Sequence, residues 1–567
     1  YAYLIPAAYY ALSNNTRVVI STNTITLQDQ LINKDIPDLK AALGLELRAA
    51  VLKGRGNYLC PRRLEGMRQR TPENADELRV LGKVLVWLNQ GGMGDRAEIN
   101  LNGPIEREVW NRLSAEDEGC KAEVCMSRMG GACPFQRART AAQSAHLLIV
   151  NHALLLADVV TGSRVLPEYN YLIVDEGHHL EAATTNALSF RVTQWDINRM
   201  LKELGGLSSG ILSRLYSILS KMLPPSETAA YHQSVQRATD LAFRLDYDFG
   251  EFYRALDHFL EDARDGYPVG NYGQQTRVTP ATRTLPAWEN VEVAWDTCRE
   301  TLSLLIQLLG EVHKSASDQA EDAPEELEDS LGGLGTLLRR FMEVEANLTA
   351  LVSQGDENFV YWAEIGANNG RIALQIAPIN IGPMMELHLW HQKASVIVTS
   401  ATLTTNGEFD YLRNRLNADE ADELVLGSPF DYESSALLYL VDDIPEPTDG
   451  NYQRLLEGTL TRLAQATNGR MLVLFTSYAQ LKKTSRAINA ELSKHGIEVY
   501  EQGEGSSTNT LLETFREAEK AVLLGTRAFW EGVDIPGEAL SVLVITKLPF
   551  DVPSDPIIAA RSETFDD

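Results

Sequence analysis

Short apolar runs alternate with helical segments along most of this chain. Four of these runs are bounded by polar residues and are continuous rather than alternating: 17–22, 146–152, 171–174 and 394–399. Such runs are typical of strands buried on both faces of a parallel sheet. A helical pattern over residues 1–12 precedes the first run, and a second helix, with Leu27 and Leu31 at helical spacing, follows it. The pattern predicts an α/β fold.

The period changes to a purely helical one between Glu181 and about Leu351. Apolar residues such as Ile211 and Leu215 recur there at helical spacing. The segment Ser317–Ser330 breaks this pattern, because it holds seven acidic residues and no basic one. Such a charge run is typical of a solvated loop. We expect an all-helical insertion, interrupted by this acidic loop, between two parts of the α/β fold.

Strand-like patterns return at 359–365 and 371–376, and a second series of alternating elements follows. Its expected helices are 452–466, 479–493 and 511–519, and its expected strands are 471–475, 497–500, 521–524 and 540–547. Alternation of strand and helix predicts a second parallel sheet. For a chain of 567 residues, the usual domain size predicts roughly three to five domains.

The run at 171–174 leads into the most distinctive stretch of the sequence, Asp175-Glu176-Gly177-His178-His179. Parallel sheets bind ligands beyond the carboxyl ends of their strands, where Asp175 and Glu176 are expected. One carboxylate there can hold Mg²⁺ on nucleotide phosphates, and a second can orient or deprotonate an attacking water. A solvated turn at a strand end is the simpler explanation for the two acids alone, but Asp-Glu-Gly-His after an apolar strand is more specific.

Two further stretches carry side chains suited to a phosphate backbone. Thr22 ends the first apolar run, where a hydroxyl can hydrogen-bond a phosphate or cap the next helix equally well. The loop that starts at Lys53 combines glycines with Lys53, Arg55 and Tyr58. The two cations can neutralise phosphates, and the tyrosine can stack on a base. A solvated basic surface is the simpler alternative for this loop.

Five cysteines in so long a chain exclude a disulfide scaffold. Cys298 stands apart, and the other four follow the spacing C-x59-C-x4-C-x7-C: Cys60, Cys120, Cys125 and Cys133. In a cytosolic protein such clustering indicates a metal, and four thiolates can hold either zinc or an iron–sulfur cluster. The spacing favours iron–sulfur, because it lacks the CxxC pairs typical of structural zinc. Unrelated buried thiols are the third interpretation.

The net charge of −27 argues against a protein that binds duplex DNA over its whole surface, but it leaves room for a local basic channel. Hydrophobic residues make up 44% and charged residues 23% of the chain, as in soluble globular proteins. No apolar run is long enough to span a membrane, and no signal peptide opens the sequence. We therefore expect a cytoplasmic protein.

Taken in order, the motifs resemble those of the iron–sulfur helicases of superfamily 2, the family of bacterial DinG and YoaA and of the xeroderma pigmentosum group D helicase. The resemblance covers essentially the whole chain and is closest to the DinG type. The matching stretches are STNTITLQDQL (motif Ia), KGRGNYLC with the further cysteines (cluster domain), VDEGHHL (motif II), TSATL (motif III), LVLFTSY (motif IV) and GTRAFWEGVDIPG (motif V). Coincidence does not explain six matches in the family's order.

The resemblance implies two RecA-like parallel-sheet motor domains that clamp ATP between them while single-stranded DNA crosses both. It implies an ATP-dependent 5′–3′ DNA helicase that unwinds duplexes or repair and replication intermediates. An iron–sulfur domain and an all-helical arch would be inserted into the first motor domain. The implied boundaries are 1–56, 141–183 and 356–433 for motor domain 1, 57–140 for the cluster domain, 184–355 for the arch and 434–567 for motor domain 2.

The resemblance also implies roles for individual residues. Asp175 would bind Mg²⁺, and Glu176 would position or deprotonate the water that attacks the γ-phosphate of ATP. The residues expected to hold a 4Fe–4S cluster are Cys60, Cys120, Cys125 and Cys133. The residues expected to couple nucleotide to DNA are His178, Ser400, Thr402, Gly532 and Asp534. The expected DNA contacts are Thr22, Lys53, Arg55, Tyr58 and Ser477, whereas Trp530 is expected to pack in the core.

The sequence departs from the family pattern at both ends. It contains no G-x-x-x-x-G-K-[ST] phosphate loop, although YAYLIPAAYYAL resembles the helix that follows this loop. The arginine-containing motif VI would be expected after LPFDVPSDPIIAARSE. We therefore expect a fragment trimmed at both ends that hydrolyses ATP negligibly by itself.

Three alternatives stay open on the sequence. They are a DNA-binding protein without motor activity, a helicase fused to an upstream exonuclease domain, and an RNA helicase of the Asp-Glu-Ala-His type, which the cysteine cluster disfavours. The expected partners are single-stranded and forked DNA, with single-strand-binding protein and replisome components as candidate protein partners. The expected location is the bacterial cytoplasm, in association with the nucleoid.

Overall fold

The described residues form two compact units. The computed structural model describes residues 1–69, 72, 74–101, 103–116, 133–162, 165–270, 273–319, 325–366, 370–503, 508–526, 529–531, 533 and 535–564. So far as they are described, the first unit comprises Tyr1–Ala115, Gly131–Asn151 and Glu420–Asp551. The second comprises Glu116–Gly130, His152–Asp419 and Val552–Asp567.

The first unit begins with three parallel strands, of which β3 (Leu147–Asn151) lies between β2 (Ala49–Val51) and β1 (Val18–Thr22). All five residues of β1 are buried, which explains the continuous apolar run. The polar Thr22 pairs with Asn151 at the carboxyl ends of their strands. The helices of this part are α1 (Leu4–Ser13), α2 (Ile25–Gln30), α3 (Ile36–Leu43), α4 (Pro61–Arg68), α5 (Ala75–Asn89), α6 (Gly103–Leu113) and α8 (Pro134–Ser144).

A second parallel sheet in the first unit has the strand order β11-β12-β10-β13. Its strands are β10 (Met471–Leu474), β11 (Glu498–Glu501), β12 (Ala521–Gly525) and β13 (Val542–Ile545), and its helices are α20 (Tyr452–Ala466), α21 (Tyr478–Ser493) and α22 (Thr508–Glu517). The central β10 and β12 are fully buried. The short α19 (Tyr432–Ser435) precedes this sheet. The predicted alternation of strand and helix, and the parallel sheet, are confirmed.

The second unit contains the acidic-box strand β4 (Tyr171–Asp175), which pairs in parallel with β9 (Ser395–Thr399). Outside the helical insertion, the helices of this unit are α9 (His152–Val160), α10 (Leu180–Leu188), α17 (Gly382–His388), α18 (Asp410–Leu416) and α23 (Pro556–Glu563). Helix α10 starts directly after the acidic box and packs against α9.

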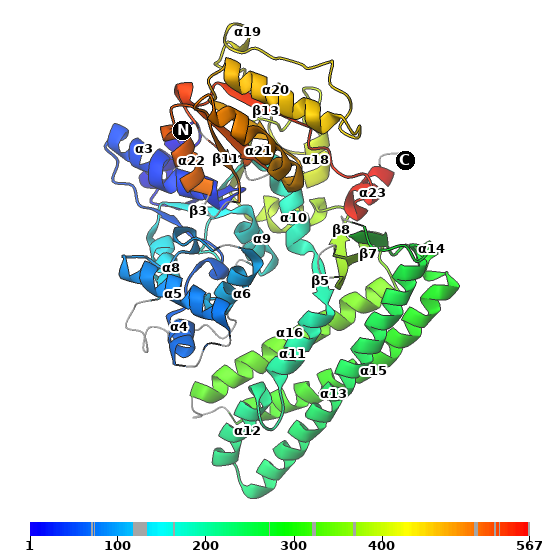
Figure 1. The fold of residues 1–567 in the computed structure, drawn as a ribbon. Coiled ribbons are helices and arrows are strands. Elements are labelled where there is room, and N and C mark those ends of the chain that lie inside the picture. The colour runs from blue at the N-terminus through cyan, green and yellow to red at the C-terminus, as the bar shows by residue number, and fades with distance from the viewer. Residues whose placement is uncertain are drawn as a thin grey trace. The chain divides into compact units, whose positions relative to one another are not determined.

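The helical insertion is built on long helices that run beside one another (Figure 1). They are α11 (Gln194–Leu204), α12 (Gly210–Met222), α13 (Pro225–Asp262), α15 (Pro286–Ser317) and α16 (Glu325–Val352), with the short α14 (Pro280–Arg283) before α15. Trp295 of α15 is fully buried against the rings of Phe249 and Phe252 on α13. Apolar faces at helical spacing therefore form the core of the insertion, as predicted.

Two features of the insertion differ from the prediction. Strands β5 (Phe190–Thr193) and β6 (Gln274–Arg277) interrupt the helices, and they join β7 (Phe359–Ile365) and β8 (Ile372–Pro378) in an antiparallel sheet of order β5-β8-β7-β6. The prediction of helices alone was wrong here, because such short strands carry too few apolar positions to show a period.

The acidic loop is shorter than predicted. Helix α15 continues to Ser317, and α16 already begins at Glu325, within the stretch expected to be a loop. Leu327 is fully buried and anchors this first turn of α16 in the core of the insertion. An apolar contact therefore extends the helix into an acidic sequence that local composition assigns to solvent.

Among the described helices, none combines the length and apolar character of a membrane span.

Candidate active site

The acidic box lies at the carboxyl end of β4, beside the end of β9. Leu172, Ile173 and Val174 are buried, and Asp175 pairs in register with Thr399. Because both strands run in the same direction, the residues that follow them leave the sheet at the same level. The sequence Asp-Glu-Gly-His after β4 therefore meets the sequence Ser-Ala-Thr after β9.

The backbone turns sharply at the second acid of the box. Glu176 adopts a left-handed conformation with a φ of 55°, which a side chain with a Cβ adopts only at a cost of about 1–2 kcal/mol. A tight helical turn, Gly177–His179, follows at once. A Cβ atom on Gly177 would lie 2.3 Å from Cγ1 of Val398 on β9. Only glycine fits between the turn and β9, which explains its place in the box.

Four of the predicted residues meet through one hydroxyl, and we call this group the Ser400 joint: Glu176, His178, Ser400 and Thr402. The Oγ atom of Ser400 lies 2.6 Å from Nδ1 of His178 and 3.5 Å from a carboxylate oxygen of Glu176. It also accepts a 3.3 Å hydrogen bond from the backbone N–H of Thr402. Glu176 and His178 are partly exposed, so the joint faces solvent on one side. A change in protonation or ligation at Glu176 can therefore reach the segment after β9 through one side chain.

Sequence reasoning missed a histidine that supports the backbone of the box. His152 begins α9 and is almost fully buried. Burial lowers the pKa of His152 to about 4, and hydrogen bonds with the backbone of Glu176 and Asp175 oppose this only in part. The ring is therefore neutral near pH 7 and fixes the backbone of the box. Its only sequence signal was a polar residue at the end of the apolar run 146–152.

The structure places the predicted DNA contacts at different depths. Lys53 is only 4% exposed, and its Nζ atom lies 3.0 Å from Asp29 and 2.7 Å from Asp95. Burial alone would lower the pKa of Lys53, but the two carboxylates outweigh it and raise the pKa. In this structure the ammonium group therefore joins α2 to the segment before α6.

The remaining predicted DNA contacts divide in the same way. Tyr58 is buried; its hydroxyl accepts a 3.0 Å hydrogen bond from Lys53 N–H, and burial raises its pKa to about 12. Thr22 is also buried. Arg55 is exposed, with its guanidinium over the Phe135 ring. Ser477 caps α21 and is partly exposed. Of the five, Arg55 and Ser477 reach the surface directly, and all five stay predictions as DNA contacts.

Two of the four clustered cysteines fall within the described residues. Cys60 and Cys133 are both buried, and each lies directly before a helix whose first residue is proline, α4 and α8 respectively. Buried cysteine sulfurs are donors that suit a metal ion or an iron–sulfur cluster, so both residues suit the ligand role. Cys120 and Cys125 lie outside the described residues. Burial raises the pKa of the Cys298 thiol, which is enclosed in the helical insertion.

The carboxyl edge of the second sheet holds a smaller network that sequence reasoning also missed. The side-chain oxygen of Gln502 accepts hydrogen bonds from the backbone N–H and the hydroxyl of Thr526, both at 2.8 Å. The Tyr478 hydroxyl donates to the backbone carbonyl of Gln502 at 2.7 Å. Gln502 thus ties together the segments after β10, β11 and β12.

Trp530 packs against the adjacent apolar cluster, as expected, whereas Gly532 and Asp534 lie outside the described residues.

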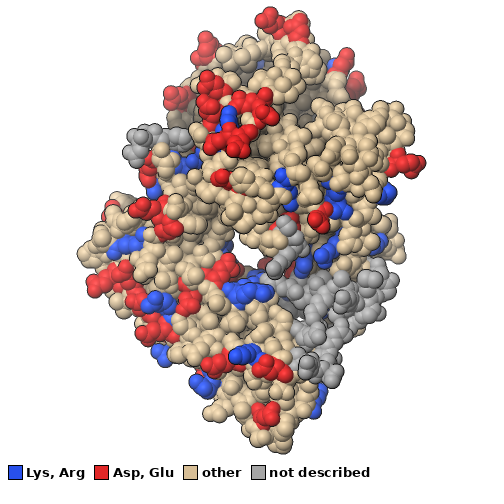
Figure 2. Space-filling view, turned by 180° about the vertical axis from the view of Figure 1, so that it is seen from behind, with Lys and Arg blue, Asp and Glu red and all other residues tan. Residues whose placement is uncertain are grey.

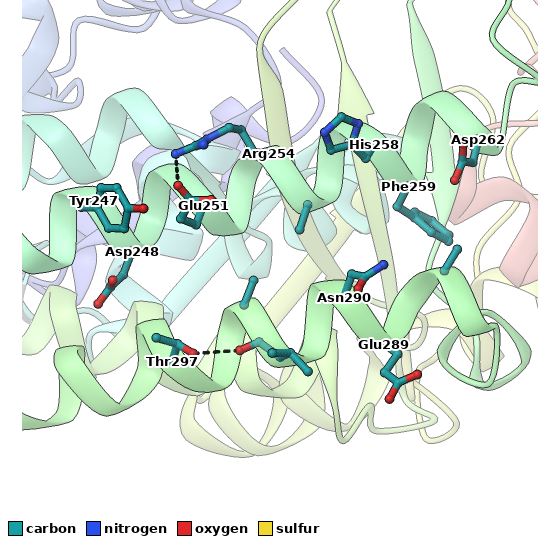
Figure 3. A pocket seen from close by; sticks show the side chains of 14 residues that line it. Tyr247, Asp248, Glu251, Arg254, His258, Phe259, Asp262, Glu289, Asn290 and Thr297 are labelled. Atoms are coloured by element: carbon teal, nitrogen blue, oxygen red, sulfur yellow. Dashed lines mark hydrogen bonds and ion pairs between the residues drawn. The ribbon is translucent and has the colours of Figure 1, made fainter.

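The charges on the surface are mixed. On the face drawn in Figure 2, patches of Asp and Glu lie among the Lys and Arg side chains. A groove of about 700 Å³ between α13 and α15 holds none of the predicted residues (Figure 3). It is lined by acidic side chains such as Asp262 and Glu289, and its Arg254 is paired with Glu251. Among the residues that the structure describes, neither this face nor the groove forms a continuous basic surface, which agrees with the net charge of −27.

The buried His152 predicts a pH dependence of stability. Because its folded pKa of about 4 lies below the ordinary value of 6.5, the unfolded chain binds the proton more tightly. The stabilisation is present above pH 6.5 and is lost as the pH falls toward 4, by about 3 kcal/mol at most. Urea unfolding of the 567-residue chain, with chelator present, should show this slope. His152→Gln should flatten it between pH 6.5 and 4, and an unchanged slope would contradict the assignment.

Comparisons with known proteins agree with the predicted family. The helicase C-terminal domain model matches residues 460–567, and the DEAD_2 model matches residues 119–197. The ATP-dependent DNA helicase DinG of Photobacterium profundum is 30% identical over 99% of this chain and 81% of its own length. The 3′-5′ exonuclease DinG of Bacillus subtilis is 29% identical over 99% of this chain, which spans 60% of that relative's length.

Among solved structures, an XPD helicase is similar over 100% of this chain and 87% of its own, at 14% identity and a TM-score of 0.43. The relationship to DinG rests on the sequence, because identity of 30% extends over most of both chains. The family predicted from the ordered motifs is thus confirmed. The chain belongs to the DinG-type helicase family.

Proposed function

We propose that the natural protein is an ATP-dependent DNA helicase that moves 5′ to 3′ on single-stranded DNA and unwinds duplexes or repair and replication intermediates. The Ser400 joint is the observation that carries the proposal. It connects Glu176 to a segment from another part of the sequence through Ser400, whose Oγ atom lies 3.5 Å from the Glu176 carboxylate and 2.6 Å from Nδ1 of His178. A DNA motor needs such a connection, because ATP hydrolysis must change the affinity of the protein for DNA.

The residues of the box have distinct roles in this proposal. Glu176 orients or deprotonates the water that attacks the γ-phosphate of ATP. Its left-handed backbone and its neighbour Ser400 hold the carboxylate at the strand end. A change at Glu176 during hydrolysis alters its contacts with His178 and Ser400, and through Ser400 it affects the position of Thr402. Gly532 and Asp534 are proposed to act in the same coupling from the second motor domain.

Mg²⁺ is the metal that suits the box. Asp175 stands at the end of a buried strand and supplies carboxylate oxygens, which are the ligands that Mg²⁺ prefers. When bound, the ion supplies positive charge that stabilises the nucleotide phosphates. Asp175 is therefore proposed as the Mg²⁺ ligand, with Glu176 free to act on water.

The cysteine segment is proposed to hold a 4Fe–4S cluster through Cys60, Cys120, Cys125 and Cys133. The support comes from the donor set, since Cys60 and Cys133 are buried thiols at helix starts. Four thiolates suit this cluster, and they also suit zinc. We keep the domain division inferred from the motifs, with the cluster domain at 57–140 and the arch at 184–355.

DNA is the proposed partner of the surface loops. Arg55 and Ser477 offer a cation and a hydroxyl at the surface, which suits contacts with the phosphate backbone. Lys53, Tyr58 and Thr22 are buried, and they are proposed to contribute to DNA binding from beneath these surface residues. Forked DNA, single-strand-binding protein and replisome components are the proposed wider partners.

A second candidate function is an exonuclease activity elsewhere in the natural protein. The Bacillus subtilis relative is named a 3′-5′ exonuclease, and this chain spans 60% of its length. Release of nucleotides from a 3′-labelled strand by the full-length natural protein, without ATP, would support this second function. The helicase proposal does not depend on it.

Removal of the proposed catalytic carboxylate tests the helicase function. Glu176→Gln in the full-length natural protein should reduce DNA-stimulated ATP hydrolysis by at least about 100-fold, the scale for loss of a general base. DNA binding, measured by fluorescence anisotropy, should be unchanged. Glu420→Gln, at an exposed acid in the same chain, should leave hydrolysis intact. Equal turnover of Glu176→Gln and the parent protein would contradict the assignment.

Metal analysis tests the cluster. The purified chain should be brown, with roughly four iron atoms per polypeptide, as four thiolates holding a 4Fe–4S cluster require. Cys120→Ser should remove the visible absorbance, whereas Cys298→Ser should keep it, because Cys298 is buried in the helical insertion. Stoichiometric zinc without iron would refute the cluster and favour a structural zinc site.

A further inference from the structure

One carboxylate beside the acidic box is shared by two arginines. Glu181 lies in the first turn of α10. Its Oε1 atom accepts a 2.8 Å hydrogen bond from Nε of Arg415 and lies 3.1 Å from Nη1 of Arg561. All three side chains are between 12% and 14% exposed. Such a shielded ion pair is worth more than a surface pair, because water screens it less.

Arg561 makes further contacts that fix its orientation. Its guanidinium donates to the hydroxyl of Thr185, one helical turn further along α10, at 2.6 Å. It also donates to the backbone carbonyl of Ile379 at 3.1 Å. Burial lowers the pKa of Arg561, with Arg415 adding to this effect and Glu181 opposing it. The Arg561 side chain thus extends from α23 and contacts two successive turns of α10.

Helix α23 is also attached to the sheet at the base of the helical insertion. Ala560 is buried with Val360 and Trp362 of β7, and Ile557 packs against the same cluster. At its end, Glu563 forms a two-pronged ion pair with Arg277 of β6, at 2.6 and 3.0 Å. Asp555 caps the start of the helix. One short helix therefore joins α10 to the antiparallel sheet.

Along the chain, α23 follows directly after the second sheet, which belongs to the first unit. The helicase C-terminal domain model covers residues 460–567, but the chain passes at Asp551–Val552 from the first unit into the second. Pro549, Pro553 and Pro556 stiffen this passage, because each proline ring fixes its φ angle.

We propose that α23 is a strap that positions the acidic box: Arg561 holds Glu181 and Thr185 of α10, so that the segment following the last strand of the second sheet sets the place of Glu176. The inference rests on the proposed ATPase function. Arg561 is a positioning residue, since it touches α10 and does not reach the reacting atoms.

Two features carry the strap's effect to the box. Helix α10 begins at Leu180, and only the tight turn Gly177–His179 separates it from Glu176. Leu180 is fully buried, which anchors the helix start directly after the turn. Arg415 belongs to α18, which follows the segment of Ser400 and Thr402. Glu181 therefore joins the strap to both sides of the Ser400 joint.

Hydrogen exchange of the 567-residue chain tests the strap without reference to activity. Arg561→Gln should raise amide exchange in α10 and α23 by about tenfold or more, the scale for losing hydrogen bonds from a charged group. Ile557→Ala, which loosens the strap without touching Glu181, should raise exchange in α10 in the same direction. Ser562→Ala, at an exposed position of α23, is the matched control and should change nothing. Unchanged protection of α10 in both test variants would overturn the proposal.

The kinetic arm uses the full-length natural protein. Arg561→Gln should lower the kcat of DNA-stimulated ATP hydrolysis by about two- to thirtyfold, as expected for a residue that acts through its neighbours, with an unchanged KM for ATP. Arg561→Lys keeps the charge but not the planar fork of donors. Its kcat should lie between those of the parent protein and Arg561→Gln. A higher KM with unchanged kcat would overturn the positioning role. An inactive parent protein would overturn the helicase proposal, and the exchange data would then decide alone whether α23 holds α10.

Discussion

The hydroxyl of Ser400 is the contact on which the candidate site depends. Because β4 and β9 are neighbouring parallel strands, the two segments that follow them emerge side by side, and a single hydroxyl lies within reach of His178, Glu176 and the Thr402 amide. The left-handed Glu176 and the tightly packed Gly177 bring the carboxylate to this hydroxyl. Backbone geometry thus joins the proposed hydrolytic group to the segment after β9, through which a motor can pass on the state of its nucleotide.

The surroundings of the joint restrain the box on several sides. The neutral His152 holds its backbone from within the unit, and Glu181 fixes the following helix through Arg415 and Arg561. In the proposed function, the α23 strap and the Ser400 joint serve one purpose, because the carboxylate of Glu176 must be held in place to act on water. Glu181 also pairs with Arg561 of α23, and α23 in turn packs against β7 of the antiparallel sheet.

The sequence predicted those parts of the fold that depend on local pattern. Continuous apolar runs identified β1, β3, β4 and β9, and the ordered motifs identified the box and its partner Ser400. Polar contacts between residues far apart in sequence could not be predicted in this way. The sequence marks Lys53 as a cation, but it does not show that Asp29 and Asp95 pair with it in the folded chain. The strand β6, with the sequence QQTR, has no apolar period and forms because β7 offers it an edge.

A double-mutant cycle on the Ser400 joint tests the central claim most directly. DNA-stimulated ATP hydrolysis would be measured for the full-length natural protein and for His178→Ala, Ser400→Ala and the double variant. If the two side chains act as one unit, the double variant should be little worse than the more damaging single variant, with a coupling energy of about 1–2 kcal/mol. Losses that simply add would show that the two residues act independently and would contradict the account.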